Sequence, residues 1–422
     1  MQERTERQSE LRLWQHGAVF LLAYAVSISR RPDAILRAQF FAEDGHVWFA
    51  DAYNQGWYPA LFQAHTGYFQ TLPRLGAAIA LLAPLSLAPL VLNLIAFAVQ
   101  ALPANLLLSS RLEPWGNLRF RAALAGIYLA LPNCAELSYG ITESQWLLAL
   151  CAFLLLSASP PGGIAGKAFD LAILSLCGLT GPFCIFLTPI ALFMAWRQRD
   201  RWHWLTAGCL ASLCLVQVWA LLVVDPTGRP HLTLGVSPGL LARILAGQIY
   251  LGVLLGDNGL ATSTSPRLLF VFVFAAIAGT TIVAICLSRS AMPMKLFVLF
   301  STAILAALLV SPVTPANASA WESLASASGA HYWFLPSLAF AWSLLWCLYS
   351  RVKTLKVISY VLVIFMCFGI VRAWVRPPFI DLHFARDAQR FETAPPGTAV
   401  IFPENPQGWD FRLVKRHPST DR

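Results

Sequence analysis

Long apolar runs separated by short polar breaks constrain the fold of this chain more than any other feature of its sequence. Hydrophobic residues make up 57% of the 422 residues and charged residues only 12%, against about 25% charged in an ordinary soluble domain. A helix of about 20 apolar residues is long enough to cross a bilayer. The pattern therefore predicts an all-α polytopic membrane protein. About eleven spans are expected, near residues 11–29, 85–109, 119–133, 144–158, 168–180, 182–196, 203–224, 267–288, 295–311, 333–350 and 356–374.

The positions of Lys and Arg predict the orientation of these spans, because short cytoplasmic loops carry an excess of both. Every second break is basic and is expected in the cytoplasm, whereas the intervening breaks are acidic. This parity places the N-terminus inside, and it places the loop over about 30–71 and the C-terminal tail outside. The basic breaks contain Arg111, Arg119, Arg121, Arg197, Arg199, Arg201, Arg289, Lys295, Arg351, Lys353 and Lys356.

Two further apolar stretches are not expected to be ordinary spans. Parity allows residues 72–109 a single crossing, so Leu72–Leu82 is predicted to be an interfacial helix, broken from the next span by Pro84 and Pro89. The run Leu240–Leu255 is predicted to be another surface helix or a re-entrant element.

The C-terminal tail differs in composition from the rest of the chain. It is punctuated by Pro377-Pro378 and Pro395-Pro396-Gly397, and the segments Thr398–Phe402 and Asp410–Val414 alternate as short strands do. The predicted organisation is a transmembrane domain over 1–374 and a small extracytoplasmic cap over 375–422. The cap is expected to pack on the outer face of the helices, because it is too short for a large core of its own.

An acidic pair, Glu43-Asp44, stands out in the first outer loop. Carboxylates at a membrane surface are costly unless they are solvated or have a function. A carboxylate that faces outward beside a lipid-facing groove can act as general base toward an acceptor hydroxyl. Two solvated loop acids are the alternative. The stretch Gly45–Gln55 is expected to be helical and to lie along the interface.

A sugar donor at this depth would be a lipid that carries a phosphate, and phosphate needs cationic or hydrogen-bonding partners. Aromatic rings can stack on sugar faces, although single aromatic residues at this depth also form the ordinary interfacial belt. The candidate substrate-binding residues are Arg37, Arg74, Arg243, His331, Tyr332, Trp48 and Tyr68.

The remaining acids and the net charge carry weaker signals. Glu136 and Glu143 flank a second outer loop and are expected to be solvated, with contact to an acceptor as the alternative. No metal or other cofactor is expected, because the spacing of the possible ligands is not diagnostic of a divalent cation. The net charge of +9 indicates contact with anionic membrane lipid rather than with nucleic acid. The residues that could in principle bind a divalent cation are Glu43, Asp44, His46 and Asp51.

Several short motifs occur in an order that resembles a known family of membrane enzymes. They are Glu43-Asp44 after the first span, Tyr68–Leu75 at the end of the first outer loop, Leu131-Pro132-Asn133 with Glu136 and Gln145-Trp146 in the second, His331–Pro336 before a late span, and Asn405–Trp409 in the tail. In these motifs and in its layout the chain resembles the bacterial members of the GT-C superfamily of polyprenyl-phosphate-sugar-dependent glycosyltransferases. Many of these relatives have Arg at the place of His331.

The resemblance implies an integral-membrane glycosyltransferase of the bacterial inner membrane, with its active site on the periplasmic face. The donor would be an undecaprenyl- or other polyprenyl-phosphate sugar, and the acceptor a glycan, a lipid or a protein. Asp44 would remove the acceptor proton, Glu43 would orient or assist, and direct displacement would invert the anomeric carbon.

Three other function classes are compatible with the sequence. A transporter or flippase would show ionisable residues near the membrane midplane or an inverted repeat, whereas the acids here lie at the outer ends of spans. An envelope polysaccharide polymerase or ligase would place Arg in a large late loop, and residues 312–332 contain none. A non-catalytic scaffold would tolerate loss of the acidic pair.

Overall fold

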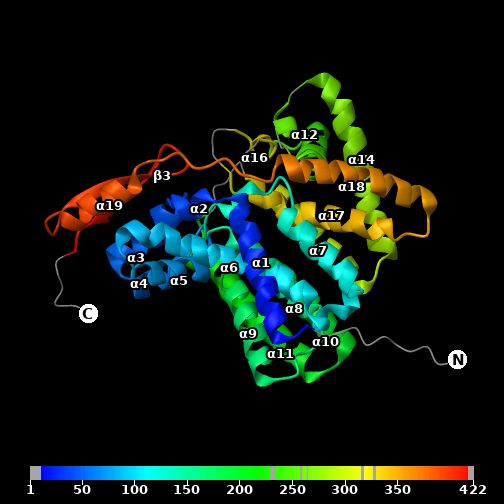
Figure 1. Cartoon of the computed structure of the whole chain (residues 1–422), viewed down its shortest axis with the longest axis horizontal. Helices are drawn as coiled ribbons and strands as arrows, with labels where there is room; N and C mark the ends of the chain where they lie inside the picture. The colour runs from blue at the N-terminus through cyan, green and yellow to red at the C-terminus, as the bar shows by residue number, and fades with distance from the viewer. Residues whose placement is uncertain are drawn as a thin grey trace.

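The structure is a computed structural model that describes residues 11–228, 233–256, 259–263, 265–314, 318–326 and 329–416. It is mainly helical, with two small antiparallel hairpins (Figure 1). The helices that match predicted spans are α1 (Leu13–Arg30), α6 (Ala88–Leu108), α7 (Leu118–Ala130), α8 (Ser144–Leu156), α9 (Ile164–Gly178), α10 (Cys184–Gln198), α11 (Arg201–Trp219), α14 (Pro266–Arg289), α15 (Met292–Val310), α17 (Phe334–Leu348) and α18 (Lys353–Arg372).

The shorter elements lie in the connections and in the tail. They are α2 (Asp33–Leu36), η1 (Asp44–Phe49), α3 (Ala50–Gln55), α4 (Trp57–Leu61), β1 (Ala64–His65), β2 (Tyr68–Phe69), α5 (Thr71–Ala80), η2 (Leu85–Leu87), η3 (Ser110–Trp115), η4 (Ala135–Ser138), η5 (Ala220–Val224), α12 (Pro238–Arg243), η6 (Ile244–Tyr250), α13 (Leu251–Leu255), η7 (Gly259–Thr262), α16 (Ala320–Leu324), η8 (Ala330–Trp333), α19 (Phe384–Thr393), β3 (Ala399–Glu404) and β4 (Trp409–Val414).

Within the described residues, six continuous helices are long and apolar enough to cross a membrane. Five correspond to predicted spans, and the sixth, Pro238–Leu255, is the run expected to be a surface or re-entrant element. This confirms a helical protein of membrane type, while eleven crossings stay a prediction. The six are Leu85–Leu108, Arg201–Val224, Pro238–Leu255, Arg267–Arg289, Met292–Val310 and Lys353–Arg372.

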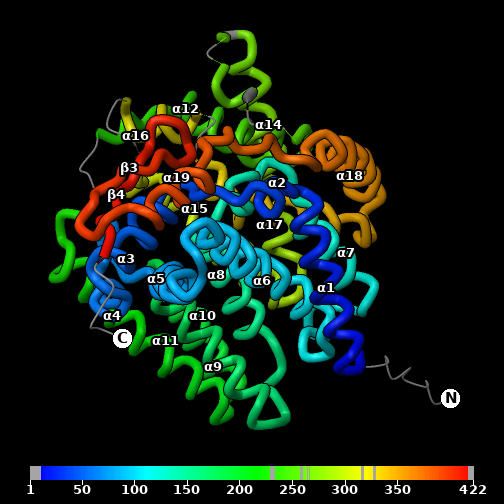
Figure 2. Tube along the Cα trace, turned by 60° about the vertical axis from the view of Figure 1, so that its left-hand side comes forward, coloured from blue at the N-terminus to red at the C-terminus, as the bar shows by residue number. Residues whose placement is uncertain are grey.

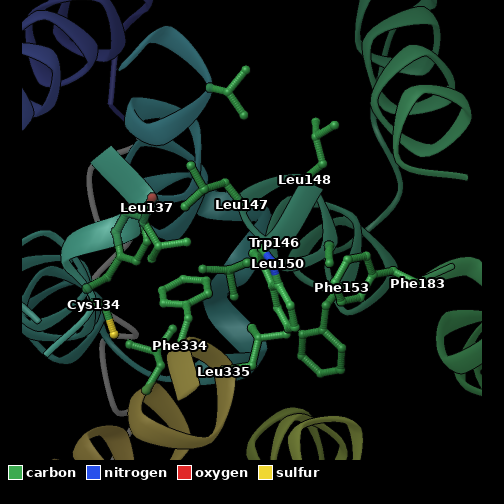
Figure 3. Close-up of a cluster of buried hydrophobic side chains, with 14 of the residues drawn as sticks. Cys134, Leu137, Trp146, Leu147, Leu148, Leu150, Phe153, Phe183, Phe334 and Leu335 are labelled. Atoms are coloured by element: carbon green, nitrogen blue, oxygen red, sulfur yellow. The ribbon is translucent and has the colours of Figure 1, made fainter. Parts of the chain in front are cut away.

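The core lies around two helices that are surrounded by others. Every residue of α8 is buried, and α17 is buried along almost its whole length. A helix that is apolar on all sides is stable only where neighbours cover all of it. Figure 3 shows side chains of α8, including Trp146 and Leu150, beside Phe334 and Leu335 at the start of α17.

The first loop forms a compact helical layer rather than an extended connection. The predicted helix over Gly45–Gln55 is confirmed: it consists of the π-helical segment η1 followed by α3. The predicted helix over Leu72–Leu82 is also present as α5. Between them, the two-stranded hairpin of β1 and β2 returns the chain toward α10, because Gln70 forms a bridge with Thr180.

The C-terminal tail covers this layer. The two predicted strands are confirmed as β3 and β4, and both views show them with α19 beside α3 (Figure 2). Helix α19 is an element that we did not predict. It buries Phe384, Ala388 and Phe391, whose spacing of four and three residues is a helical one.

An aromatic cluster joins the tail to the first loop. The ring of Phe40 lies 5.1 Å from that of Phe384 and 5.3 Å from that of Phe411, measured between centroids. The backbone N–H of Ala42 donates to the carbonyl of Asn405, and the Asn405 N–H donates to Phe40 at 3.3 Å. The tail is therefore attached next to the acidic pair.

Candidate functional site

A cavity of about 600 Å³ lies where the first loop, the second loop and η8, the turn just before α17, meet. Its lining combines ionisable and aromatic side chains with an apolar wall from three helical segments. The ionisable and aromatic lining residues include Glu43, Glu136, Glu143, His65, His331, Trp48, Tyr68, Trp146, Tyr332 and Trp409.

The two members of the acidic pair face different surroundings. Glu43 is half-buried and lines the cavity, and within the described part of the chain no hydrogen bond engages its carboxylate. Asp44 is only 2% exposed and is not among the lining residues. Adjacent positions on a helical turn point about 100° apart, so the start of η1 presents one acid to the cavity and the other to the protein interior. π-Helical turns are frequent at functional sites.

The carboxylate of Asp44 binds the second loop. It accepts backbone N–H bonds from Ile141 at 3.0 Å and Thr142 at 3.1 Å, and a 2.6 Å bond from the Thr142 hydroxyl. Burial raises the pKa of Asp44 to about 7, although these three donors oppose the shift. The Trp48 indole donates to the same Thr142 hydroxyl at 2.7 Å. Asp44 therefore holds the loop that carries Glu143 against the segment that carries Glu43.

Gly140 lies directly against this carboxylate. A Cβ at this position would come within 1.9 Å of Asp44 Oδ2, so a side chain here cannot coexist with the bonds from Ile141 and Thr142.

We expect Gly140→Ala to lower the free energy of unfolding by about 1–3 kcal/mol, because it displaces a buried acceptor from its donors. Urea unfolding of the protein in detergent micelles measures this change. The matched control is Gly126→Ala in α7, where an added Cβ meets no atom within 4 Å and where Ala is the better helix former. Equal stability of the two variants would contradict the role of Gly140.

Two carboxylates flank one imidazole on another part of the cavity wall. His331 Nδ1 lies 2.6 Å from Glu136 Oε2 and 3.3 Å from Glu143 Oε1. Glu136 also accepts the backbone N–H of Gly329 at 3.1 Å, whereas Glu143 Oε2 is buried without a partner among the described atoms. We call Glu136, His331 and Glu143 the imidazole cluster.

Charges within the imidazole cluster shift the pKa of each member. Burial by itself would lower the pKa of His331, but Glu143 and Glu136 raise it to about 9. Burial raises the pKa of Glu143 to about 8. Burial also acts to raise the pKa of Glu136, yet the hydrogen bonds and the charge of His331 hold the pKa of Glu136 below its usual value. At neutral pH the cluster therefore holds an imidazolium and an ionised Glu136, while Glu143 keeps its proton to a higher pH than an exposed carboxyl group does.

A third acid approaches the acidic pair from the tail. Glu404 in β3 is 2% exposed. It lies so close to Gly45 that a Cβ added there would be only 2.3 Å from Glu404 Oε2. Burial raises the pKa of Glu404 to about 9, with Asp44 and Glu43 adding to the shift. Glu404 is therefore protonated at neutral pH, which removes a charge that would repel the pair.

The structure brings together only part of the predicted site. Trp48, Tyr68, His331 and Tyr332 line the same cavity as Glu43, whereas none of the three predicted arginines does.

Each predicted arginine has another position. Arg74 is buried, pairs with Asp51 at 3.1 Å and lies 5.0 Å from the centre of the Trp48 ring. Arg243 donates to the carbonyl of Ala261. Arg37 is exposed and lines a separate cavity beside Asp33. None of the three guanidinium groups lines the main cavity, and their role as phosphate contacts stays a prediction.

The imidazole cluster also corrects the interpretation of the second loop. Glu136 and Glu143 were expected to be solvated, but their side chains are only 17% and 9% exposed. The signal in the sequence was the pair of acids next to Gln145-Trp146 in an otherwise apolar context. Its meaning depends on His331, which lies about 190 residues later in the chain and becomes a neighbour only in the fold.

The possible metal ligands of the first loop do not converge. Asp51 pairs with Arg74, and His46 Nδ1 lies 2.8 Å from the carbonyl oxygen of Asp410. In the ranges that the structure covers, no group of three or more His, Cys, Asp or Glu side chains is arranged to hold a metal ion.

A second cavity, of about 390 Å³, lies at the opposite end of the helices. Helix α15 begins at this cavity with Met292 and reaches the first cavity with Leu308, and its 19 residues span about 28 Å. Arg197 lines the second cavity beside the pair formed by Asp200 and His203. The acidic breaks therefore lie at one end of α15, and the basic breaks lie at its other end.

Comparison with known proteins adds no assignment, since no protein-family model matches the chain and no curated protein matches it significantly.

Proposed function

We propose that this protein is an integral-membrane glycosyltransferase that moves a sugar from a polyprenyl-phosphate donor to an acceptor hydroxyl. One observation carries the proposal: a half-buried carboxylate without a partner in the described chain, Glu43, shares a cavity with an imidazolium, His331. A carboxylate can accept the proton of an attacking hydroxyl, and a cation can stabilise a leaving phosphate. The resemblance to the GT-C superfamily leads to the same reaction.

In this proposal Glu43 is the general base, in place of Asp44. Asp44 has its acceptor capacity directed at the backbone of Ile141 and Thr142 and does not line the cavity. Glu43 removes the proton as the acceptor oxygen attacks the anomeric carbon. The bond between that carbon and the phosphate oxygen breaks, and the polyprenyl phosphate leaves with the electron pair. A direct displacement of this kind inverts the anomeric carbon.

The imidazole cluster supplies the partners of the phosphate. His331 is positively charged at neutral pH, and with Nδ1 engaged by Glu136 it retains the N–H of Nε2 for a phosphate oxygen. The buried Oε2 of Glu143 has no partner among the described atoms and can donate a further bond when this carboxyl group carries its proton. This arrangement supports His331 in the role that Arg has in many relatives, with its charge stabilised by the ionised carboxylate of Glu136.

The apolar wall of the cavity is suited to an isoprenoid chain. We call it the helix wall; it consists of Ile185 and Phe186 of α10, Leu221 of η5, and Ile304, Ala307 and Leu308 of α15. Phe183, which also lines the cavity just before Ile185, is linked to the imidazole cluster through Trp146, whose ring lies 4.8 Å from that of Phe183 and 5.8 Å from that of His331. A donor with its phosphate at His331 would thus find apolar surface beside it.

We expect Ala307→Trp to raise the KM for a donor with a long isoprenoid chain at least tenfold, because the indole fills the helix wall. The KM for a donor with two isoprene units should rise much less. Steady-state kinetics with both donors measure the difference. The control is Ala306→Trp, one position along the same helix but exposed. An equal effect of Ala307→Trp on both donors would contradict this path for the chain.

The distribution of charge supports the proposed orientation. The cavity that contains Glu43 lies at one end of α15, and Arg197 lies at the other end. Two further basic breaks, Arg111–Arg121 and Arg289–Lys295, also lie at the end with Arg197, between consecutive helices. Basic loops favour the cytoplasmic side. The reaction would therefore occur on the extracytoplasmic face, in the inner membrane if the chain is bacterial.

Release of free polyprenyl phosphate tests the proposed function. Purified protein is incubated with a panel of polyprenyl-phosphate sugars and acceptor extracts, and the lipid product is quantified by mass spectrometry. Turnover of at least one donor is the expected result. Tight binding of these lipids without turnover would favour a transporter or flippase instead.

A further inference from the structure

The turn between β3 and β4 forms part of the cavity lining. Pro406 and Trp409 lie in the wall together with Phe41, Ala42 and Glu43. We call these five residues the cap wall. It differs from the helix wall in origin, because it joins the first loop to a tail more than 360 residues away in the sequence.

The cap wall is held together by backbone bonds next to the proposed base. The parallel bridge between Phe41 and Asn405 is closed by the bond from the Ala42 N–H to the Asn405 carbonyl. Ala42 precedes Glu43 directly, so the backbone bonds fix Glu43 relative to the turn and to Trp409, the first residue of β4. Behind them, buried Glu404 packs against Gly45.

Trp409 is the large aromatic residue of this wall. It is 41% exposed although it lines a cavity. Among the described residues its one ring contact is with His46, at 5.9 Å between centroids and an interplanar angle of 75°. An edge contact of this kind fixes the orientation of the indole without stacking a second ring on its face.

We propose that the cap wall is the acceptor subsite and that the acceptor presents a pyranose ring, which stacks on Trp409 while one of its hydroxyl groups faces Glu43. The inference rests on the proposed function and deepens it, because it names the chemical class of the acceptor. A pyranose has an apolar face of C–H groups and a polar rim, which complements an indole beside a carboxylate.

The division between the two walls supports this assignment. The helix wall and the imidazole cluster are suited to the lipid chain and the phosphate of the donor, which leaves the cap wall for the acceptor. The base belongs at the acceptor, and Glu43 is part of the cap wall. A serine or threonine hydroxyl on a peptide would gain little from the indole face, whereas a sugar ring would bury one whole face against it.

The experiment compares acceptors on the full-length protein in detergent micelles, with the donor that the parent protein turns over. The acceptor probes are a panel of methyl pyranosides and a serine-containing peptide. Trp409→Ala is expected to raise the KM for the best pyranoside about tenfold, with a much smaller change in the KM for the donor. Trp409→Phe should recover part of the loss. Trp57→Ala is the control, because Trp57 is also exposed, at 53%, but lies outside the cavity lining.

The outcomes separate the inference from the function on which it rests. Transfer to pyranosides with the acceptor-specific effect of Trp409→Ala supports both. Transfer to the serine peptide alone, or an equal effect of Trp409→Ala and Trp57→Ala, overturns the pyranose subsite and leaves the glycosyltransferase intact. Absence of donor turnover in the parent protein with every acceptor overturns both.

Discussion

Replacement of Glu43 by Gln is expected to lower the rate of polyprenyl-phosphate release by about 10²–10⁴-fold, the usual effect of losing a general base. The thermal unfolding temperature should stay close to that of the parent protein. Both expectations follow from the position of Glu43, which lines the cavity and has no hydrogen-bond partner in the described chain. Glu113→Gln, an exposed acid at the other end of the helices, is the control for the loss of one charge.

Asp44→Asn distinguishes Glu43 from its neighbour. In Asp44→Asn the NH₂ group of the amide replaces one carboxylate oxygen and faces a backbone N–H of Ile141 or Thr142. Two donors that face each other in a buried site lower the free energy of unfolding by about 1–3 kcal/mol. We therefore expect Asp44→Asn to lower the unfolding temperature as well as the activity. A stable but inactive Asp44→Asn protein, together with an active Glu43→Gln protein, would return the role of base to Asp44.

Replacement of His331 by Gln is expected to have the largest effect on stability. It removes the cation beside Glu136 and leaves this carboxylate ionised in a site where it is only 17% exposed. Breaking such a pair costs about 3 kcal/mol. Activity should fall as well, because the proposed phosphate contact is lost. Thermal and urea unfolding measure the first effect, and lipid release the second.

A double variant separates the two roles of His331. Glu136→Gln removes the uncompensated charge, and Gln can still accept the N–H bond from Gly329. In His331→Gln/Glu136→Gln we expect most of the stability to return without the activity. Recovery of activity in the double variant would show that His331 has only a structural role.

The same cluster predicts how stability depends on pH. The folded-state pKa of His331 is raised, so its contribution is fully present below the unfolded value of about 6.5 and is lost as the pH rises through about 9. The folded-state pKa of Glu143 is also raised, so its contribution is fully present below the unfolded value of about 4.5 and is lost as the pH rises through about 8. The parent protein should therefore lose stability between about pH 4.5 and 9, and His331→Gln should lose less above about pH 6.5.

The sequence predicted the secondary structure well where a local pattern determined it. Apolar runs identified the helices from α1 to α18 that match spans, and alternation with Pro and Gly identified β3 and β4. These elements follow from the hydrophobicity and hydrogen bonding of neighbouring residues, which a sequence displays directly. Helix α19 escaped prediction because its apolar stripe, Phe384, Ala388 and Phe391, is short and surrounded by charges.

The sequence by itself thus determined that the chain is an apolar helical protein with an acidic pair after its first helix. Only the tertiary structure decided which carboxylate of that pair faces a cavity, because the direction of a side chain depends on what packs against its helix. It also decided that His331 lines this cavity, whereas none of the three predicted arginines does. Arg74 lies near Glu43 in the sequence but is neutralised by Asp51, whereas His331 is brought to Glu136 and Glu143 by contacts between segments that are distant in the chain.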